Sequence, residues 1–241
     1  MSTVVTPYKN SLPKKEQVAT MFDNIAYHYD LLNSILSFGT HTVWRKKAIR
    51  LLKKENPKYI LDIATGTADF AIEALKLEPV EVIGIDISEG MLKLGQKKLN
   101  KRGLEKKIKL LKGDSENLPF EANRFDAVTV AFGVRNFENL EKGLMNIFTV
   151  LKPGGTVVIL EFSRPTNFIM KRLYKFYFNH ITPLIGRLFS KDSSAYTYLP
   201  ESVNAFPDGE NFVAILNRNG FSETRYYSLS LNIATIYIGK K

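Results

Sequence analysis

The hydrophobic residues of this chain follow two different periods, and the change falls near residue 57. From residue 18 to residue 53, apolar residues recur every three or four positions, which predicts amphipathic helices. Pro57 ends that pattern, and beyond it short apolar runs alternate with amphipathic stretches. The runs, which predict strands, are residues 59–64, 82–86, 108–111, 125–132 and 156–162. The stretches, which predict helices, are residues 69–77, 89–101 and 140–151.

Strands that alternate with helices favour a parallel sheet with helices on both faces. Residues 128–130 and 157–159 are all Val, Ile or Thr, so we expect them in central strands that are buried on both sides. A helix over 208–217 precedes two further strands, 223–229 and 232–239, whose short connection predicts an antiparallel pair. The sequence thus predicts an α/β fold with a mostly parallel, seven-stranded sheet and an antiparallel C-terminal strand.

A single domain, residues 18–241, accounts for most of the chain, whose 241 residues suit one domain. Residues 1–17 are polar and contain two prolines, which predicts a flexible N-terminal arm. Within the domain, residues 18–53 are expected to form a helical cap over the substrate. Residues 165–205 interrupt the strand pattern, and their aromatic and basic start predicts an inserted helical lid.

The composition excludes several classes of protein and of site. Hydrophobic residues make up 44% of the chain and charged residues 24%, which excludes disorder for most of its length. Cys is absent, so a disulfide framework, a Cys-ligated zinc site and a thiol nucleophile are excluded. No clustered His or Asp ligands are visible in the sequence either, and we expect no metal site.

The net charge of +10 favours an anionic partner: nucleic acid, an anionic membrane surface or a phosphorylated ligand. The densest basic run, residues 91–112, is interpreted as the solvated face of a helix and its loop. No apolar run reaches the ~18 residues of a spanning helix, and residues 1–17 lack the apolar segment of a secretory signal. We therefore expect a cytoplasmic protein whose contact with membranes is confined to the inner surface.

Polar residues follow the predicted strands at their carboxyl ends, where open α/β sheets bind ligands. Gly66 allows a tight turn after the first strand, and Asp86 ends the second strand, where it can accept hydrogen bonds from ribose hydroxyls. A single glycine replaces the Gly-x-Gly-x-x-Gly of dinucleotide sites. Asp62, four residues before Gly66, would repel phosphates but attract a sulfonium and an ammonium. The pattern favours S-adenosylmethionine, with Asp114 facing the adenine amino group. A simple turn at Gly66 and a helix N-cap at Asp86 are the alternatives.

Several segments resemble the signatures of the ubiquinone/menaquinone biosynthesis C-methyltransferases. The first signature is matched by residues 29–37 followed by His41 and Trp44. The second is matched by residues 151–155 together with 160–163. Residues 117–120 and 132–136 are also similar, and the resemblance covers about residues 18 to 240. The departures are Leu32 in place of Met, Thr149 in place of Arg, Ala131 in place of Ser and Ala68 in place of Gly.

The resemblance implies a Rossmann-like class I S-adenosylmethionine-dependent methyltransferase fold. It also implies cofactor contacts by Thr67, Asp86, Asp114 and Ser115. The implied substrate is a prenylated quinol methylated on a ring carbon. We favour demethylmenaquinol in menaquinone biosynthesis, with a methoxy-polyprenyl benzoquinol of ubiquinone biosynthesis as the alternative.

The chemistry of the quinol suggests the catalytic residues. An oxidised quinone carbon is too electron-poor to attack a methyl sulfonium, whereas a quinol can attack once a phenolic proton, with a pKa near 10, has left. A nearby cation favours that loss, and Arg135 is the candidate, its alternative role being a salt bridge that holds the loop. Asn136 would orient a water or a quinol oxygen. His41 is either a general base or a brace for the N-terminal helices.

The sequence leaves open more than one kind of binding partner. The aromatic and basic segment 165–190 is either the core of a lid helix or an apolar channel for a prenyl tail whose cations meet anionic lipids. An RNA methyltransferase would use the same charge, but the sequence lacks an Asn-Pro-Pro-Tyr motif and a Cys, so we expect no nucleic-acid partner. A non-catalytic scaffold that binds the cofactor is the other alternative, and a homodimer stays open.

Overall fold

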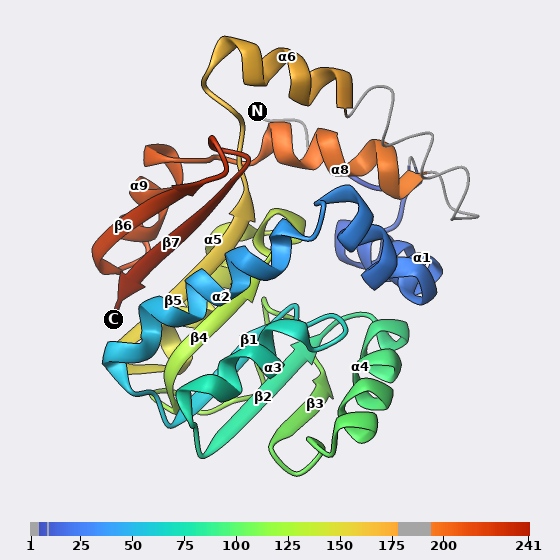
Figure 1. Ribbon diagram of the computed structural model, residues 1–241. Coiled ribbons are helices and arrows are strands. Elements are labelled where there is room, and N and C mark those ends of the chain that lie inside the picture. The colour runs from blue at the N-terminus through green and yellow to red at the C-terminus, as the bar shows by residue number, and fades with distance from the viewer. Residues whose placement is uncertain (1–4, 9, 178–193) are drawn as a thin grey trace.

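The fold is built on one seven-stranded sheet, which Figure 1 shows running through the molecule. The computed structural model describes residues 5–8, 10–177 and 194–241. The strands are β1 (Tyr59–Ile63), β2 (Glu81–Asp86), β3 (Ile108–Lys112), β4 (Phe125–Ala131), β5 (Leu151–Phe162), β6 (Ser222–Leu229) and β7 (Ala234–Lys240). Their order is β3-β2-β1-β4-β5-β7-β6, and β7 runs antiparallel to both of its neighbours. The predicted Rossmann-like sheet with its antiparallel C-terminal strand is confirmed.

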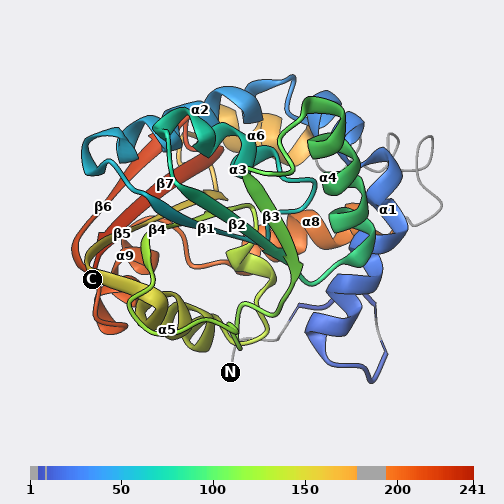
Figure 2. The ribbon, with the colours of Figure 1, turned by 90° about the horizontal axis from the view of Figure 1, so that it is seen from below.

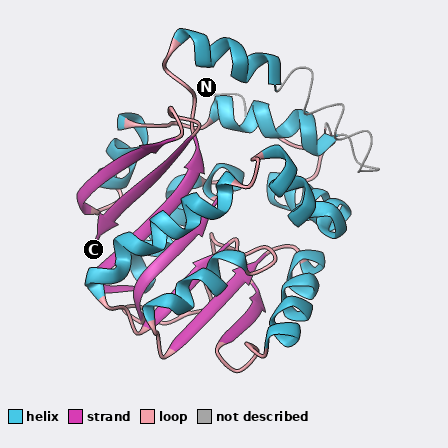
Figure 3. Cartoon of the chain, viewed as in Figure 1, coloured by secondary structure: helices cyan, strands magenta, loops and turns pink. Residues whose placement is uncertain are grey.

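Helices cover both faces of the sheet, and a third group lies beyond the ends of its strands (Figures 2 and 3). One face carries α2 (Thr40–Leu52), α3 (Asp69–Ala74) and α4 (Glu89–Arg102). The other carries α5 (Leu140–Val150) and α9 (Glu210–Arg218). The third group, α1 (Lys14–Leu36), α6 (Phe168–Phe176) and α8 (Ser194–Ala205), lies beyond the carboxyl ends of the parallel strands. Among the described residues, no helix has the length and apolar character needed to cross a bilayer.

The central strands are buried on both faces, as their β-branched composition predicts. Leu61, Val128 and Val158 are 0% exposed, and the side chains of the two faces belong to two separate apolar clusters. Burial on both sides is what fixes β1, β4 and β5 in the middle of the sheet. The carboxyl ends of these three strands are therefore rigid supports for the loops that follow them.

Two boundaries differ from the predictions by four residues or more, each for a local reason. Helix α1 begins at Lys14, directly after Pro13 and inside the segment predicted as an arm. There the side-chain amide of the buried Gln17 donates to the Leu12 carbonyl oxygen at 2.6 Å. Strand β5 begins at Leu151, because that residue pairs with β4 before a bulge opens at residues 152–155. Residues 178–193 of the predicted lid lie outside the described residues.

Candidate functional site

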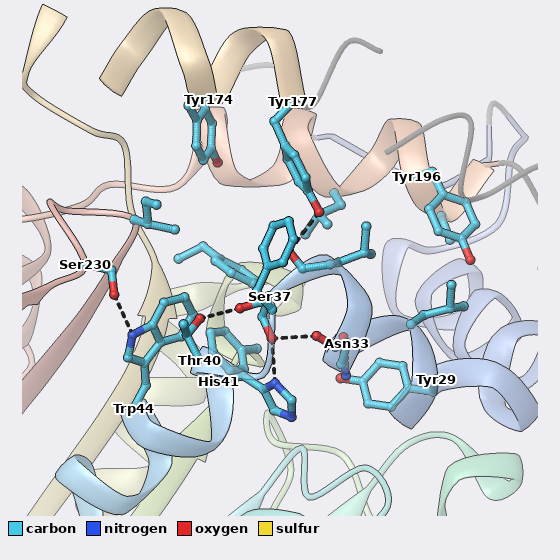
Figure 4. Close-up of a pocket in the computed structure, with 18 of the residues that line it drawn as sticks. Tyr29, Asn33, Ser37, Thr40, His41, Trp44, Tyr174, Tyr177, Tyr196 and Ser230 are labelled. Atoms are coloured by element: carbon cyan, nitrogen blue, oxygen red, sulfur yellow. Dashed lines mark hydrogen bonds between the residues drawn. The ribbon is translucent and has the colours of Figure 1, made fainter. Parts of the chain in front are cut away.

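Two cavities lie at the edge where the parallel strands end. The larger has a volume of about 470 Å³ and is lined mainly by apolar side chains of α1, α2, α6 and α8 (Figure 4). The smaller, of about 70 Å³, lies over the ends of β1 and β2 and the loop after β3. Phe22, Tyr29 and Phe132 line both cavities. We call these three side chains the aromatic wall, because they lie between the larger apolar space and a smaller one that carries the carboxylates Asp86 and Asp114.

Asp86 is the central polar group of the smaller cavity. It ends β2, is 8% exposed and accepts hydrogen bonds from the backbone N–H groups of Gly66 and Ser88, both at 2.8 Å. Burial raises the pKa of this carboxyl to about 6, while the two N–H donors oppose the shift. The predicted pair of Gly66 and Asp86 is thus brought together, with the turn after β1 held against the end of β2.

Asp62 and Thr67 lie beside this cavity but do not line it. Asp62 is fully buried and accepts hydrogen bonds from the hydroxyls of Thr65 at 2.6 Å and Thr129 at 2.7 Å. Thr67 donates to Asp30 of α1 at 2.7 Å and accepts from Lys98 of α4 at 2.9 Å. In this structure both residues hold the turn and its helices in place, and their predicted contact with a cofactor stays a prediction.

The loop after β3 brings Asp114 and Ser115 to the opposite side of the smaller cavity. Asp114 accepts from the backbone N–H of Glu116 at 2.9 Å, which orients the carboxylate. Its other oxygen pairs with the ammonium of Lys15 at 3.1 Å. Lys15 belongs to the first turn of α1 and lines the same cavity, so α1 closes over the predicted adenine side. The sequence analysis missed this lysine, because residues 1–17 show no hydrophobic periodicity that would have placed Lys15 in a helix over the cavity.

The loop after β4 forms the boundary between the cavities. Phe132 adopts a left-handed conformation with φ of +58°, which turns its carbonyl oxygen toward the side chains of Arg135 and Asn136. A Cβ on Gly133 would lie 2.6 Å from the Cβ of Ala64, so only glycine allows the loops after β1 and β4 to pack this closely. The result is a rigid turn that holds the Phe132 ring in the aromatic wall.

Arg135 lines the larger cavity and forms a buried ion pair with Glu161 at the end of β5, at 2.9 Å. The side chains of Arg135 and Glu161 are 7% and 0% exposed, and burial raises the pKa of Glu161 although Arg135 opposes the shift. The Nε atom of Arg135 is also buried and has no hydrogen-bond partner within the described part of the chain. A ligand oxygen could bind that donor only after the surrounding side chains shift, because Nε itself has almost no exposed surface. An acid in an otherwise apolar strand was the signal that could have found Glu161.

Asn136 and α1 complete the support of this loop. The amide oxygen of Asn136 accepts from the Tyr198 hydroxyl of α8 at 3.1 Å, and Asn136 lines the smaller cavity. The ammonium of Lys14 donates to the carbonyl oxygens of Arg135 and Phe137, both at 3.0 Å. Burial, together with the nearby charge of Arg135, lowers the pKa of Lys14 to about 8. The loop is therefore fixed from β5, α8 and α1 at once.

His41 lines the larger cavity at the start of α2, where Figure 4 shows it beside Ser37. Its Nδ1 lies 2.6 Å from the Ser37 hydroxyl, whose single hydrogen is directed to the Asn33 carbonyl oxygen, also at 2.6 Å. With the Ser37 hydroxyl donating to Asn33, the matching tautomer has the ring proton on Nδ1 and the lone pair on Nε2. Burial and the nearby Arg45 lower the pKa of His41 below its usual value, which favours the neutral ring.

Helix α6 closes the larger cavity on the side away from the sheet. Tyr174 and Tyr177 point into it in Figure 4, and the Tyr177 hydroxyl donates to the Leu36 carbonyl oxygen of α1 at 2.8 Å. Burial raises the pKa of Tyr177 to about 12, so this phenol stays neutral. Trp44 Nε1 donates to the Ser230 hydroxyl at 2.9 Å, which joins α2 to the hairpin between β6 and β7.

The buried pair of Arg135 and Glu161 leads to a prediction about stability. Glu161→Gln leaves a buried cation without its partner and should lower the free energy of unfolding by about 3–5 kcal/mol. The double variant Arg135→Met/Glu161→Gln removes both charges and should recover most of that loss. Glu73→Gln, at the more exposed pair with Lys76, is the control and should change stability by less than about 1 kcal/mol. Urea unfolding measures all three. A double variant no more stable than Glu161→Gln would contradict the prediction.

Comparison with known proteins agrees with the geometry. A model of the ubiE/COQ5 methyltransferase family matches residues 10–241. The demethylmenaquinone methyltransferase of Bacteroides fragilis is 49% identical over 238 residues, which cover 98% of this chain and 97% of that protein. The one from Porphyromonas gingivalis is 46% identical and covers 98% of both chains.

Solved structures support the fold independently of sequence. A SAM-dependent methyltransferase from Thermotoga maritima superposes with a TM-score of 0.66 and covers 92% of this chain and 99% of its own. Its sequence identity is 18%, so this likeness concerns the fold alone. The family model, by contrast, spans nearly the whole chain, and the relatives match it at high identity. The chain therefore belongs to the ubiE/COQ5 methyltransferase family, as the resemblance in its signatures implied.

Proposed function

We propose that this chain transfers the methyl group of S-adenosylmethionine to a ring carbon of a prenylated naphthoquinol, demethylmenaquinol, to give menaquinol. The observation that carries the proposal is the aromatic wall, at which an apolar cavity of about 470 Å³ meets a smaller one that carries the carboxylates Asp86 and Asp114. An apolar ring and a nucleoside with several hydrogen-bond donors need two such spaces with a common boundary. The relatives named demethylmenaquinone methyltransferase support the choice of substrate.

The residues of the smaller cavity fit S-adenosylmethionine by the chemistry of their side chains. Carboxylates accept hydrogen bonds from hydroxyl and amino donors, which is what a nucleoside offers. Asp86 would accept from the ribose hydroxyls and Asp114 from the adenine amino group, with Gly66 and Ser115 beside them. When bound, S-adenosylmethionine supplies an electrophilic methyl group on a sulfonium. Lys15 must leave Asp114 for the adenine side to be filled.

Arg135 would act on the oxygen of the quinol from within the larger cavity. Its guanidinium is held by Glu161 and the Phe132 carbonyl oxygen, so it cannot turn away. Within the described residues its Nε–H has no partner, and once ligand binding uncovers it, it can donate to a quinol oxygen; that hydrogen bond strengthens as the oxygen becomes negative. Asn136 is committed to Tyr198 and the Phe132 carbonyl oxygen, so we assign it to positioning the loop.

His41 is our candidate for the general base. Its neutral ring and the proton on Nδ1 leave Nε2 free to accept the phenolic proton of the quinol. The surrounding apolar residues of α1 and α6 keep water from the developing negative charge. This environment raises the energetic cost of that charge and makes the hydrogen bond from Arg135 more effective.

The remaining predictions concern the place where the protein meets its substrate, which is the surface of a membrane. A prenyl tail is apolar, so the substrate resides in a bilayer, and a net charge of +10 suits contact with anionic lipid. A cytoplasmic location at the inner face of the membrane is consistent with that setting and stays a prediction. Relatives named ubiquinone/menaquinone biosynthesis C-methyltransferase, such as the one from Geotalea daltonii at 45% identity, keep a benzoquinol as the second candidate substrate. That no nucleic acid binds is still a prediction, and so is the formation of a homodimer.

The first prediction here concerns turnover. With methyl-labelled S-adenosylmethionine, reduced demethylmenaquinol should become labelled, whereas the oxidised quinone should not, because its ring carbon is not nucleophilic. A reduced 6-methoxy benzoquinol, assayed in parallel, separates the two pathways. Label in the naphthoquinol alone assigns menaquinone biosynthesis. No label in either quinol would contradict the proposal, and labelled RNA in a parallel reaction would replace it.

The second prediction concerns entry to the smaller cavity. Lys15→Gln removes the ammonium that competes for Asp114, so the Kd for S-adenosylmethionine should fall by up to about fivefold, the equivalent of one exposed ion pair. Lys112→Gln, which breaks the pair with Glu89 outside the cavity, should leave the Kd unchanged. Isothermal titration calorimetry measures both. Weaker binding by Lys15→Gln would mean that Lys15 holds the cofactor instead of opposing its entry.

The third prediction concerns His41 and pH. A base must be unprotonated to act, so kcat should rise with pH through the His41 pKa, which lies below the usual 6.5, and then level off. His41→Gln should lower kcat by about 10²–10⁴ and abolish this acid limb, with little change in KM. His28→Gln is the matched control, because that ring packs against Tyr27 and does not line the cavity. An acid limb that persists in His41→Gln would assign the base to another group.

A further inference from the structure

Helix α6 carries an exposed apolar stripe beside its cavity-lining side. Met170, Tyr174 and Tyr177 are spaced four and three residues apart and line the larger cavity. Ile169, Leu173 and Phe176 have the same spacing, which places them about 100° around the helix. These three side chains are 66%, 56% and 58% exposed. Leu173 and Phe176 also border the cavity, so the exposed stripe is continuous with its apolar interior.

The third side of α6 is basic. Lys171, Arg172 and Lys175 are exposed and fall together on the helix, away from the cavity-lining side. No acidic residue occurs anywhere between residues 163 and 191 of the sequence. The basic side chains of α6 are thus not balanced by acids of their own segment. A helix with one apolar stripe and one basic side is typical of helices that lie in the interface of an anionic bilayer.

Other exposed apolar side chains lie at the same end of the molecule. Phe38, in the turn between α1 and α2, is 84% exposed and lines the larger cavity. Leu231, in the hairpin between β6 and β7, is 69% exposed and lies between the cavity-lining residues Ser230 and Ile233. Figure 1 shows α6 at the edge of the molecule, beyond α8. Exposed apolar residues gathered at one site mark an interaction surface.

We propose that this end of the molecule docks on an anionic lipid bilayer and presents the larger cavity to the lipid. The docking surface consists of Phe168, Ile169, Lys171, Arg172, Leu173, Lys175 and Phe176, with Phe38 and Leu231 beside it. For its substrate the inference rests on the proposed function. A prenylated quinol then passes from the bilayer into the cavity without exposing its tail to water. A second copy is disfavoured as the occupant, because a twofold contact through α6 sets its three cations against the same three cations.

Vesicle flotation tests the surface directly. Phe168→Ser/Ile169→Ser changes two side chains that are 72% and 66% exposed and do not line the cavity. With vesicles of phosphatidylcholine and phosphatidylglycerol, the variant should show at least tenfold weaker partitioning than the unchanged protein. Val80→Ser, at a side chain that is 68% exposed before the amino end of β2, should partition normally. Flotation of the double variant like the unchanged protein would overturn the proposal.

A charge variant tests the lipid chemistry. Lys171→Gln/Arg172→Gln/Lys175→Gln should lose the preference for phosphatidylglycerol over pure phosphatidylcholine. Lys93→Gln/Lys97→Gln/Lys101→Gln, with equally many exposed lysines removed from α4, should keep it. If both triple variants lose the preference equally, net charge and not this surface governs binding, and the proposal fails. A dimer in solution that Phe168→Ser/Ile169→Ser makes monomeric would show that a second copy covers the surface, which also overturns it.

Activity in detergent keeps this inference separate from the proposed function. With the quinol supplied in detergent micelles, Phe168→Ser/Ile169→Ser should transfer methyl at the rate of the unchanged protein, whereas with quinol in vesicles its rate should fall with its partitioning. Vesicle binding without methyl transfer in micelles would remove the proposed function and leave the docking surface standing. Equal rates of the variant and the unchanged protein in vesicles would remove the surface and leave the function.

Discussion

The site depends on the buried ion pair between Arg135 and Glu161. Taking both charges out of water is costly, and the cost is offset only where the geometry is close and the remaining donors are used. Here the guanidinium also binds the Phe132 carbonyl oxygen, and Glu161 accepts from the backbone N–H of Arg135 at 3.3 Å. The pair therefore fixes the loop after β4 to the end of β5. Because Phe132 belongs to that loop, the pair also fixes the boundary between the two cavities.

That boundary explains how one small domain accommodates two unlike reactants. A charged nucleoside needs hydrogen-bond acceptors, which the smaller cavity has in Asp86 and Asp114. A prenylated ring needs an apolar space, which the larger cavity has between α1, α2 and α6. Among the described residues, Phe22, Tyr29 and Phe132 line both spaces, so the alignment of the reacting atoms depends on where each ligand is held. Helix α1 lines both cavities. A movement of α1 when one ligand binds therefore also changes the shape of the cavity for the other ligand.

Much of this arrangement could be predicted from the sequence because it depends on local patterns. The mostly parallel sheet follows from the alternating periods, and Gly66 and Asp86 meet because parallel strands end at one edge. Glu161 could not be identified as the partner of Arg135, since the two are 26 residues apart and only the pairing of β4 with β5 joins them. Asp62 shows another limit, because its partners could not be identified from the sequence. The hydroxyls of Thr65 and Thr129 bind it, and hydroxyls that point inward leave no periodic signal. Its contact with the cofactor stays a prediction.

A crystal structure with S-adenosylhomocysteine and a prenylated 1,4-naphthoquinone would show whether the two reactants meet at the aromatic wall. The adenosyl group should lie between Asp86 and Asp114, with Lys15 displaced, and the quinone ring should lie in the larger cavity against Phe22, Tyr29 and Phe132. One quinone oxygen should lie within hydrogen-bond distance of Arg135 Nε. A naphthoquinone ring bound away from the aromatic wall, or an adenosyl group in the apolar cavity, would contradict the claim that the two reactants meet there.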